Sequence, residues 1–510
     1  MSRITPIALS LALPITFLSQ AALADLTPND VWGDWKQYMQ GMGYQIAATE
    51  TPNGSNLTVG DIAMSMVMPD DAGAMTMTLG TIEFEQNSDG TVSVVMPGVM
   101  PMALNITPEG AQAEPVIASL NYTQSGHSML VSGSPDKMTY DYAAGTIELA
   151  LEQLQIGADT FGAENAKMNV IGTGVNSTTT MTIAEMRGYE QTGKIDSLQY
   201  DVAINNPAEP AKVSMNGNLT DMAIQGGGMI PLVIEDAADM AAMLKAGFDV
   251  TGEFSFGAGN TNIDVADPEN GNFAMVSSSE GGNLGVEMGA DGIAYTASQN
   301  NSAITVNVAG LPFPIDLSMA TAGFNFSMPV SKSDDPQDFA FGITLGDFVM
   351  SDLIWGIFDP TSQLPRDPAT VVLDLTGKAK LLVDFLDPDA AAQLAYATPG
   401  EVQALTVNKL QLDAAGAKLD GTGDFTFDNT DQTTFPGMPK PIGAVELSLA
   451  GGNGLLDKLV AMGIIPDDQA MGARMMMGLF AVPGTEPDTL NSKVEFTEDG
   501  QVLANGQRIK

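Results

Sequence analysis

Methionines are the residues of this chain whose type and spacing come closest to chemistry. The sequence holds 32 of them, and two neighbouring segments alternate methionine with other residues: Met64, Met66 and Met68, then Met75 and Met77. Thioether sulfurs are soft ligands, so Met-x-Met spacing can serve copper(I) in an exported protein. The same side chains are pliable apolar fillers of a core or of a groove that accepts flexible chains. Because the chain has one histidine to assist a metal, we favour the apolar lining and expect no metal or other cofactor.

Two tryptophans form the second candidate site. The helix signals Thr27-Pro28-Asn29-Asp30 precede the segment VWGDWKQYMQ, which places Trp32, Trp35 and Met39 on one stripe of a predicted helix. Such a stripe fits a ligand clamp, and it equally fits a helix that plugs the open end of a sheet. We favour the plug, and both tryptophans stay candidates for ligand binding.

Catalytic and metal-binding patterns are otherwise weak. His127 is the single histidine, and Gly126-His127-Ser128 resembles a turn without a nucleophile elbow. One imidazole and no cysteine exclude the usual zinc sites. The acidic segments at 420–424 and 428–431 lack the spacing of an EF-hand, and Gly226-Gly227-Gly228 lacks the lysine of a phosphate loop. The sequence therefore predicts a non-enzymatic protein.

The elements that must position these residues are mostly strands. From Gly43 to about Thr220 the pattern alternates with period two, and close turns between the segments favour antiparallel pairing. Alternation resumes from Phe248 to Val330. Short amphipathic helices are expected between the strands, at 235–246, 353–358, 388–396, 455–462 and 467–480.

These patterns predict a mainly β protein built as a large twisted antiparallel sheet or β-groove with a few short amphipathic helices. So many strands could also close on themselves or split into two packed sheets. We divide the chain into an N-terminal β-rich region, 25–232, and a C-terminal β-rich region with short helices, 233–510. The two regions form either separate lobes or one continuous sheet.

The first 24 residues have the pattern of a secretory signal peptide. Arg3 is followed by an apolar stretch, and Ala22-Leu23-Ala24 offers small residues just before Asp25. We expect cleavage there and a periplasmic location. No later segment has eighteen consecutive apolar residues, so we expect no transmembrane anchor in the mature chain.

The charge of the chain restricts its partners. Acidic residues outnumber basic ones 62 to 20, which gives a formal charge of −42. Binding to phosphate backbones needs clustered lysine and arginine, so we exclude nucleic acid as a partner. The absence of cysteine means that an exported chain of this kind is stabilised by burial rather than by disulfides.

Three C-terminal segments carry a family resemblance. They are DLIWGIFDPTSQLPRDPA (352–369), ALTVNKLQLDAAGAKLDGTGDFTFDN (404–429) and MMMGLFAVPGTEPDTLNSKVEFTEDGQVLANGQRIK (475–510). They resemble a family of exported alphaproteobacterial proteins catalogued as domain of unknown function 2125. The strand-rich pattern is more loosely similar to periplasmic β-groove proteins of the AsmA and YdgA kind. The resemblance implies a periplasmic setting and supplies no catalytic residues, and the lack of a retained anchor separates this chain from the AsmA and YdgA kind.

Two functional hypotheses follow. The first is non-enzymatic binding of a lipid or another hydrophobic ligand on an apolar concave face, in maintenance of the cell envelope. The second is a structural or interaction protein of the envelope whose β core is filled and which binds a protein partner instead.

Overall fold

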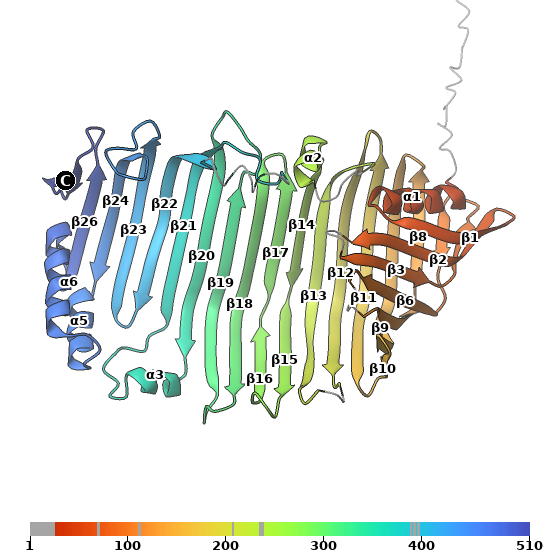
Figure 1. Cartoon of the computed structure of the whole chain (residues 1–510), viewed down its shortest axis with the longest axis horizontal. Coiled ribbons are helices and arrows are strands. Elements are labelled where there is room, and N and C mark those ends of the chain that lie inside the picture. Colours follow the sequence, from red (N-terminus) through yellow and green to blue (C-terminus); the bar gives the residue numbers. More distant parts are fainter. Residues whose placement is uncertain are drawn as a thin grey trace, which may run out of the picture.

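The computed structural model describes residues 26–68, 72–110, 114–206, 209–233, 239–387, 390, 394 and 398–510. One antiparallel sheet of 28 strands extends through this part of the chain, and five short helices are attached to it (Figure 1). The prediction of a mainly β, large antiparallel sheet with a few short helices is confirmed. The predicted signal peptide lies outside the described residues.

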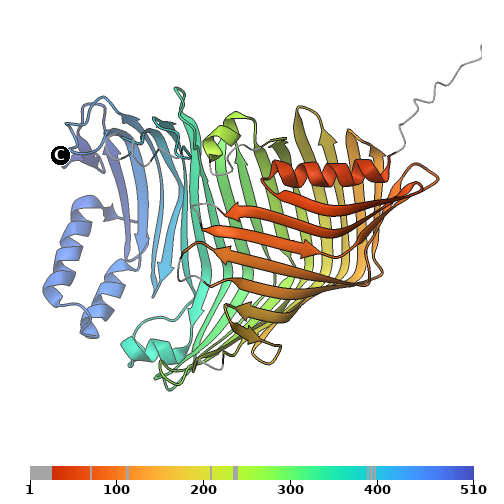
Figure 2. The ribbon, with the colours of Figure 1, turned by 45° about the vertical axis from the view of Figure 1, so that its right-hand side comes forward.

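The N-terminal strands curl over one end of the sheet (Figure 2). Helix α1 (Pro28–Gly41) lies against these strands and begins at Thr27, whose side chain accepts the Asp30 amide while the Asp30 carboxylate accepts the Thr27 amide. The strands are β1 (Gln45–Asn53), β2 (Asn56–Met68), β3 (Gly73–Leu79), β4 (Ile82–Gln86), β5 (Val92–Val95), β6 (Val99–Pro108), β7 (Val116–Ser125) and β8 (Ser128–Ser134).

Long strands connect this end to the rest of the sheet. They are β9 (Lys137–Ile156), β11 (Ala166–Ile183), β12 (Met186–Ile204) and β13 (Lys212–Pro231), with the short β10 (Asp159–Phe161). Helix α2 (Met240–Lys245) follows β13 and occupies part of the helix expected at 235–246. Strand β13 pairs with β14 (Asp249–Phe256) and β15 (Ala258–Ala266), so hydrogen bonds of one sheet continue across position 233.

The remaining strands continue the same sheet, mostly as neighbours in chain order. They are β16 (Phe273–Ser279), β17 (Gly282–Gly289), β18 (Gly292–Val308), β19 (Ile315–Met328), β20 (Gln337–Met350), β21 (Ala369–Leu381), β22 (Gly400–Ala414), β23 (Ala417–Asp428), β24 (Lys440–Ala450), β25 (Val482–Pro483), β26 (Thr489–Phe496), β27 (Val502–Ala504) and β28 (Gln507–Arg508). Helix α3 (Asp352–Phe358) lies between β20 and β21, and helices α5 (Gly452–Ala461) and α6 (Asp467–Phe480) lie between β24 and β26.

The helices predicted near 353–358, 455–462 and 467–480 are confirmed as α3, α5 and α6. The helix expected at 388–396 falls almost entirely outside the described residues. Side chains of a strand point alternately to its two faces, so a strand with one apolar face has an apolar residue at every second position. This alternation is why many of the strands could be predicted from the sequence.

Left-handed residues within three of the strands change that phase. Asp61, Gly174 and Asp221 have φ angles of 51°, 64° and 50°, and the ladder is interrupted beside each of them. In β2, Leu57 and Val59 precede Asp61 while Ile62 and Met64 follow it, and all four lie in one core cluster. A residue in this conformation thus shifts the apolar side chains by one position and keeps them on one face of the sheet.

The buried core is concentrated at the N-terminal end. It is formed by α1 and the strands that curl around it, and its members are Leu26, Val31, Trp32, Leu57, Val59, Ile62, Met64, Ile82, Phe84, Val92, Val94, Val131, Met138 and Tyr140. Beyond β13 the buried apolar side chains of the described residues are fewer and form no comparable cluster; they include Met243 and Leu244 of α2 and Leu381 of β21. The sheet therefore has one covered end and a long remainder that is a single layer.

Candidate functional site

The single-layer part of the sheet has one apolar face, which the strand register defines. Side chains of residues paired across neighbouring strands lie on the same side. One row runs through Leu284, Ala297, Phe324, Ile343, Leu373, Leu410, Gly421 and Leu447. The next row runs through Val286, Tyr295, Phe326, Phe341, Leu375, Val407, Gly423, Val445 and Val494. We call the surface that these two rows define the apolar face.

Much of the apolar face is open. Leu284 exposes 49% of its surface, Phe324 43% and Leu412, which lies two residues from Leu410 on β22, 45%. The accessible surface of the whole chain is 28893 Å², well above the roughly 18,000 Å² expected for a compact protein of 53.2 kDa. Large contiguous apolar surfaces are rare on soluble monomers and mark sites of interaction.

Aromatic side chains support one another along this face. The ring centroids of Phe254 and Phe256 lie 6.1 Å apart, and those of Phe324 and Phe341 also lie 6.1 Å apart with their planes at 84°. Edge-to-face and stacked pairs at this spacing hold rings in place without enclosing them. The face is consequently ordered and still accessible.

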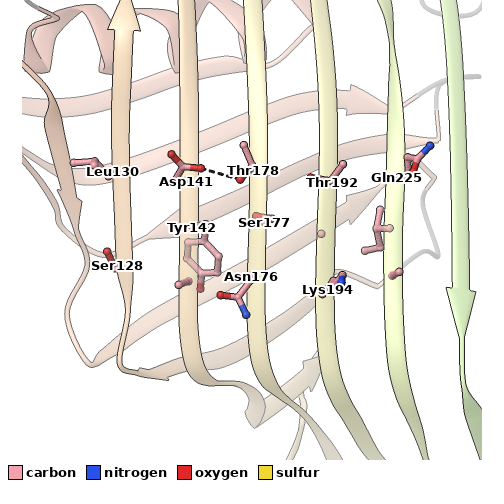
Figure 3. Close-up of a pocket in the computed structure, with 14 residues that line it drawn as sticks. Ser128, Leu130, Asp141, Tyr142, Asn176, Ser177, Thr178, Thr192, Lys194 and Gln225 are labelled. Carbon is pink, nitrogen blue, oxygen red and sulfur yellow. Dashed lines mark hydrogen bonds between the residues drawn. The ribbon is translucent and has the colours of Figure 1, made fainter.

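The opposite face is polar. Residues that alternate with the two apolar rows include Thr296, Asn325 and Asp374, and neighbouring strands are cross-linked there by pairs such as the Thr406 hydroxyl donating to Asp424 at 2.8 Å. A shallow depression of about 650 Å³ lies on this face at the N-terminal end. Figure 3 shows it on the side of the strands turned away from the curled N-terminal strands, with Thr178 donating to Asp141 at 2.8 Å.

The two candidate tryptophans lie between α1 and the curled strands. Trp32 is 3% exposed, its indole nitrogen donates to Glu50 at 2.7 Å, and its ring lies 6.1 Å from that of Phe84. Trp35 contacts Phe84 edge-on at 5.4 Å. Bonds from Lys36 and then from Trp32 lower the pKa of the Glu50 carboxyl. A ligand would have to displace α1 to reach the Trp32 ring.

The five candidate methionines lie together on one face of β2 and β3. Met64 pairs with Met77 and Met66 with Met75, and Met68 follows two residues later on the same side of β2. Met64 is 5% exposed within the core cluster, Met77 packs against that cluster, and Met66, Met68 and Met75 are half-buried. The alternation of methionine along β2 and β3 thus places all five side chains on one face, where they border the apolar core.

A buried ion pair fixes α1 to the sheet. Asp34 accepts a bond from the Arg187 guanidinium at 2.5 Å and one from the Tyr140 hydroxyl at 2.9 Å, and both Asp34 and Arg187 are almost fully buried. The guanidinium also lies over the ring of Tyr38 at 5.2 Å. Burial, and then the charge of Asp34, raise the pKa of the Tyr140 hydroxyl. Asp34 and Arg187 lie 153 positions apart, so sequence reasoning missed them.

His127 has a structural environment. Its Nε2 lies 3.0 Å from the carbonyl oxygen of Val94, and its ring lies 5.5 Å from that of Tyr142. Within the described ranges, no three histidine, cysteine, aspartate or glutamate side chains come together in a way that could hold a metal ion. In the same part of the chain, no helix is both long and apolar enough to cross a bilayer.

Comparison with known proteins found no family model, no curated protein and no solved structure that matches this chain. The function proposed below therefore rests on the geometry of the two faces.

The sequence predicted an apolar face but did not identify the residues that form it in the open part of the sheet. Its signal was present, because strands such as Gly282–Gly289 and Ile315–Met328 alternate apolar with polar or small residues. The methionines and tryptophans predicted to bind a ligand lie instead at the end that α1 covers. Alternation in the sequence is the same for covered and uncovered strands, so it does not show which strands lack a covering layer.

Proposed function

We propose that this chain is a non-enzymatic binding protein of the bacterial cell envelope that holds the acyl chains of a lipid against its apolar face. The observation that carries this proposal is the continuity of that face. Apolar side chains follow one another in register from β17 to β26, and the side chains of Leu284 and Phe324 are nearly half exposed.

The energetics of such a surface support a lipid. Each methylene group removed from water contributes roughly 0.8 kcal/mol, so an acyl chain lying across several strands gains substantial free energy without any polar contact. The aromatic and aliphatic side chains form an extended surface rather than an enclosed pocket. Such a surface suits a long flexible ligand better than a compact one.

The envelope location is part of the proposal. It rests on the signal-peptide pattern of residues 1–24 and on the resemblance to an exported family. Fractionation of the native cells, with N-terminal sequencing of the purified chain, tests this part. We expect recovery from the periplasm and a mature N-terminus at Asp25, and a chain that retains Met1 in the cytoplasm would refute it.

The binding proposal is tested by mass spectrometry of organic extracts of the protein, purified without detergent from its native compartment. We expect a lipid in stoichiometric amount, and we expect it to be lost when Phe324 and Leu412 are both changed to aspartate. Thr344→Asp on the polar face is the matched control and should retain the lipid, because Thr344 pairs with Gly323 on the side opposite to Phe324.

Clean extracts from folded protein would reject the lipid. They would favour the alternative in which an envelope protein covers the same face. The α1 end already has a filled core. The protein partner in this alternative would therefore cover the open part of the sheet.

A further inference from the structure

Helix α6 is apolar on two sides, although only one side is covered. Ala470 is fully buried against the rest of the protein. Met471, Met475 and Leu479 occupy successive turns of the outward side and expose 69%, 73% and 53% of their surface. An apolar stripe on successive turns of a helix normally faces a protein core or lipid. The outward side of α6 therefore lacks a covering surface.

Helix α3 also exposes apolar side chains. Leu353 and Ile357 lie one turn apart and expose 54% and 67% of their surface. Strands β20 and β24, which lead into α3 and α5, run in the same direction, because four antiparallel pairings separate them. Both connections thus leave the same end of the sheet (Figure 1).

Close packing joins the two connections. Gly416, in the turn between β22 and β23, lies so close to Pro365, which follows α3, that a Cβ atom at this position would clash with the proline ring. A Cβ atom at Gly451, just before α5, would likewise clash with the carbonyl oxygen of Gly416. We call α3, α5 and α6 with their exposed apolar side chains the helical end. Two separate helices therefore present apolar side chains at one end of the molecule.

The helical end is continuous with the apolar face. A side chain at Gly452 of α5 would meet the side chain of Leu449. Leu449 pairs with Leu419 and Leu490, two residues along from the row through Gly421 and Leu447. A hydrophobic ligand leaving the apolar face at β24 would thus meet α5 directly.

We propose that the helical end docks on the surface of a lipid bilayer with zwitterionic headgroups, from which acyl chains pass to the apolar face. This inference rests on the proposed lipid binding. An amphipathic helix inserts its apolar side chains at the headgroup boundary with an affinity that follows the apolar area it buries.

Charge decides the kind of bilayer. Basic side chains form no cluster at the helical end: Arg474 binds Asp457 at 2.5 Å, Arg366 binds Asp352 at 2.5 Å, and Lys458 is a single further cation in the last turn of α5. Asp467 and Asp468 add negative charge in the first turn of α6. Recognition of anionic headgroups needs clusters of unpaired lysine and arginine, so a zwitterionic surface fits better. A second copy of the chain fits less well, because two molecules with a formal charge of −42 repel each other.

Flotation of the full-length mature protein with phosphatidylcholine vesicles tests the inference. We expect the wild type to float with the vesicles and the double variant Met471→Asp, Met475→Asp to lose about 100-fold in partitioning, since two exposed side chains no longer bury apolar area. Val67→Asp is the matched control, because Val67 is 70% exposed on β2, far from the helical end (Figure 1). Adding phosphatidylglycerol to the vesicles should weaken flotation.

A second measurement locates the contact. Trp355 lies in α3, whereas Trp32 and Trp35 lie in α1. Bromine-labelled phosphatidylcholine should quench part of the tryptophan emission of the wild type, and the Trp355→Phe variant should show no quenching.

The outcomes separate this inference from the proposed function. A wild type that carries extractable lipid but does not float would overturn docking and leave lipid binding intact. Flotation that the double variant retains would also overturn it, as would a dimer in solution that Met475→Asp dissociates without any vesicle binding. Flotation without extractable lipid would support docking on a bilayer and reject the acyl chains as its cargo.

Discussion

The two ends of the sheet use the same strand pattern and reach opposite results. At the N-terminal end, α1 covers the apolar side of the strands, so Phe84 is fully buried between Trp32 and Trp35. In the open part, Phe324 occupies an equivalent apolar position, touches one aromatic neighbour and stays 43% exposed. The difference is that the 14-residue helix α1 and the strands that curl around it cover the apolar side at one end of the sheet only.

This contrast assigns stability and binding to different parts of one molecule. Burial at the α1 end contributes most of the free energy available from a core. Apolar side chains of the open part remain available because no layer is packed on them. Substitutions at matching positions of the two ends should therefore have unequal effects on stability and on ligand binding.

The largest expected effect is that of Phe84→Ala. Removing a fully buried ring leaves a cavity next to two tryptophans and should lower the free energy of unfolding by about 4 kcal/mol. Urea unfolding followed by tryptophan fluorescence reports mainly on this end, because two of the three tryptophans, Trp32 and Trp35, lie in α1. A loss below about 1 kcal/mol would show that the α1 end is not the stable core of the molecule.

Arg187→Met should follow, with a loss of about 3 kcal/mol, because Asp34 would remain buried without its positive partner. Combining Arg187→Met with Asp34→Leu should recover much of this loss, since neither charge is then left alone. A double-mutant cycle on urea midpoints measures the coupling. Additive losses from the two substitutions would contradict the pairing.

Tyr140→Phe should produce a smaller effect that depends on pH. Burial and the Asp34 charge hold the pKa of Tyr140 above its unfolded value of about 10. The folded state thus retains this proton more tightly, and its stabilising contribution is complete below pH 10 and lost as the pH rises further. The variant should lose about 2 kcal/mol at neutral pH and decline less steeply above pH 10. Parallel stability curves for both proteins above pH 10 would refute this.

Phe324→Ala should have the smallest effect on unfolding, under about 1 kcal/mol, because nearly half of its surface is already in water. Its effect on lipid content should be large by comparison. Measuring both quantities on the same preparation sharpens the contrast with Phe84→Ala. Loss of stability equal to that of Phe84→Ala would mean that the open face is part of the core.

Local sequence patterns predicted much of the secondary structure. Alternation predicted the strands, and the hydroxyl of Thr27, the proline that follows it and Asp30 predicted the start of α1. The helices α5 and α6 were also found from local periodicity. These features depend on residues within a few positions of one another, where propensity and capping act.

The sequence by itself thus determined that the protein is a β-sheet with apolar and polar sides and short capped helices. Only the tertiary structure decided which apolar residues are covered, because coverage depends on strands and helices that are distant in the chain. It placed Arg187 against Asp34 across 153 positions, and it placed the left-handed Gly174 and Asp221 on either side of Asp196 of the strand between them. Register between strands and the docking of α1 are long-range choices, which no local pattern of residues specifies.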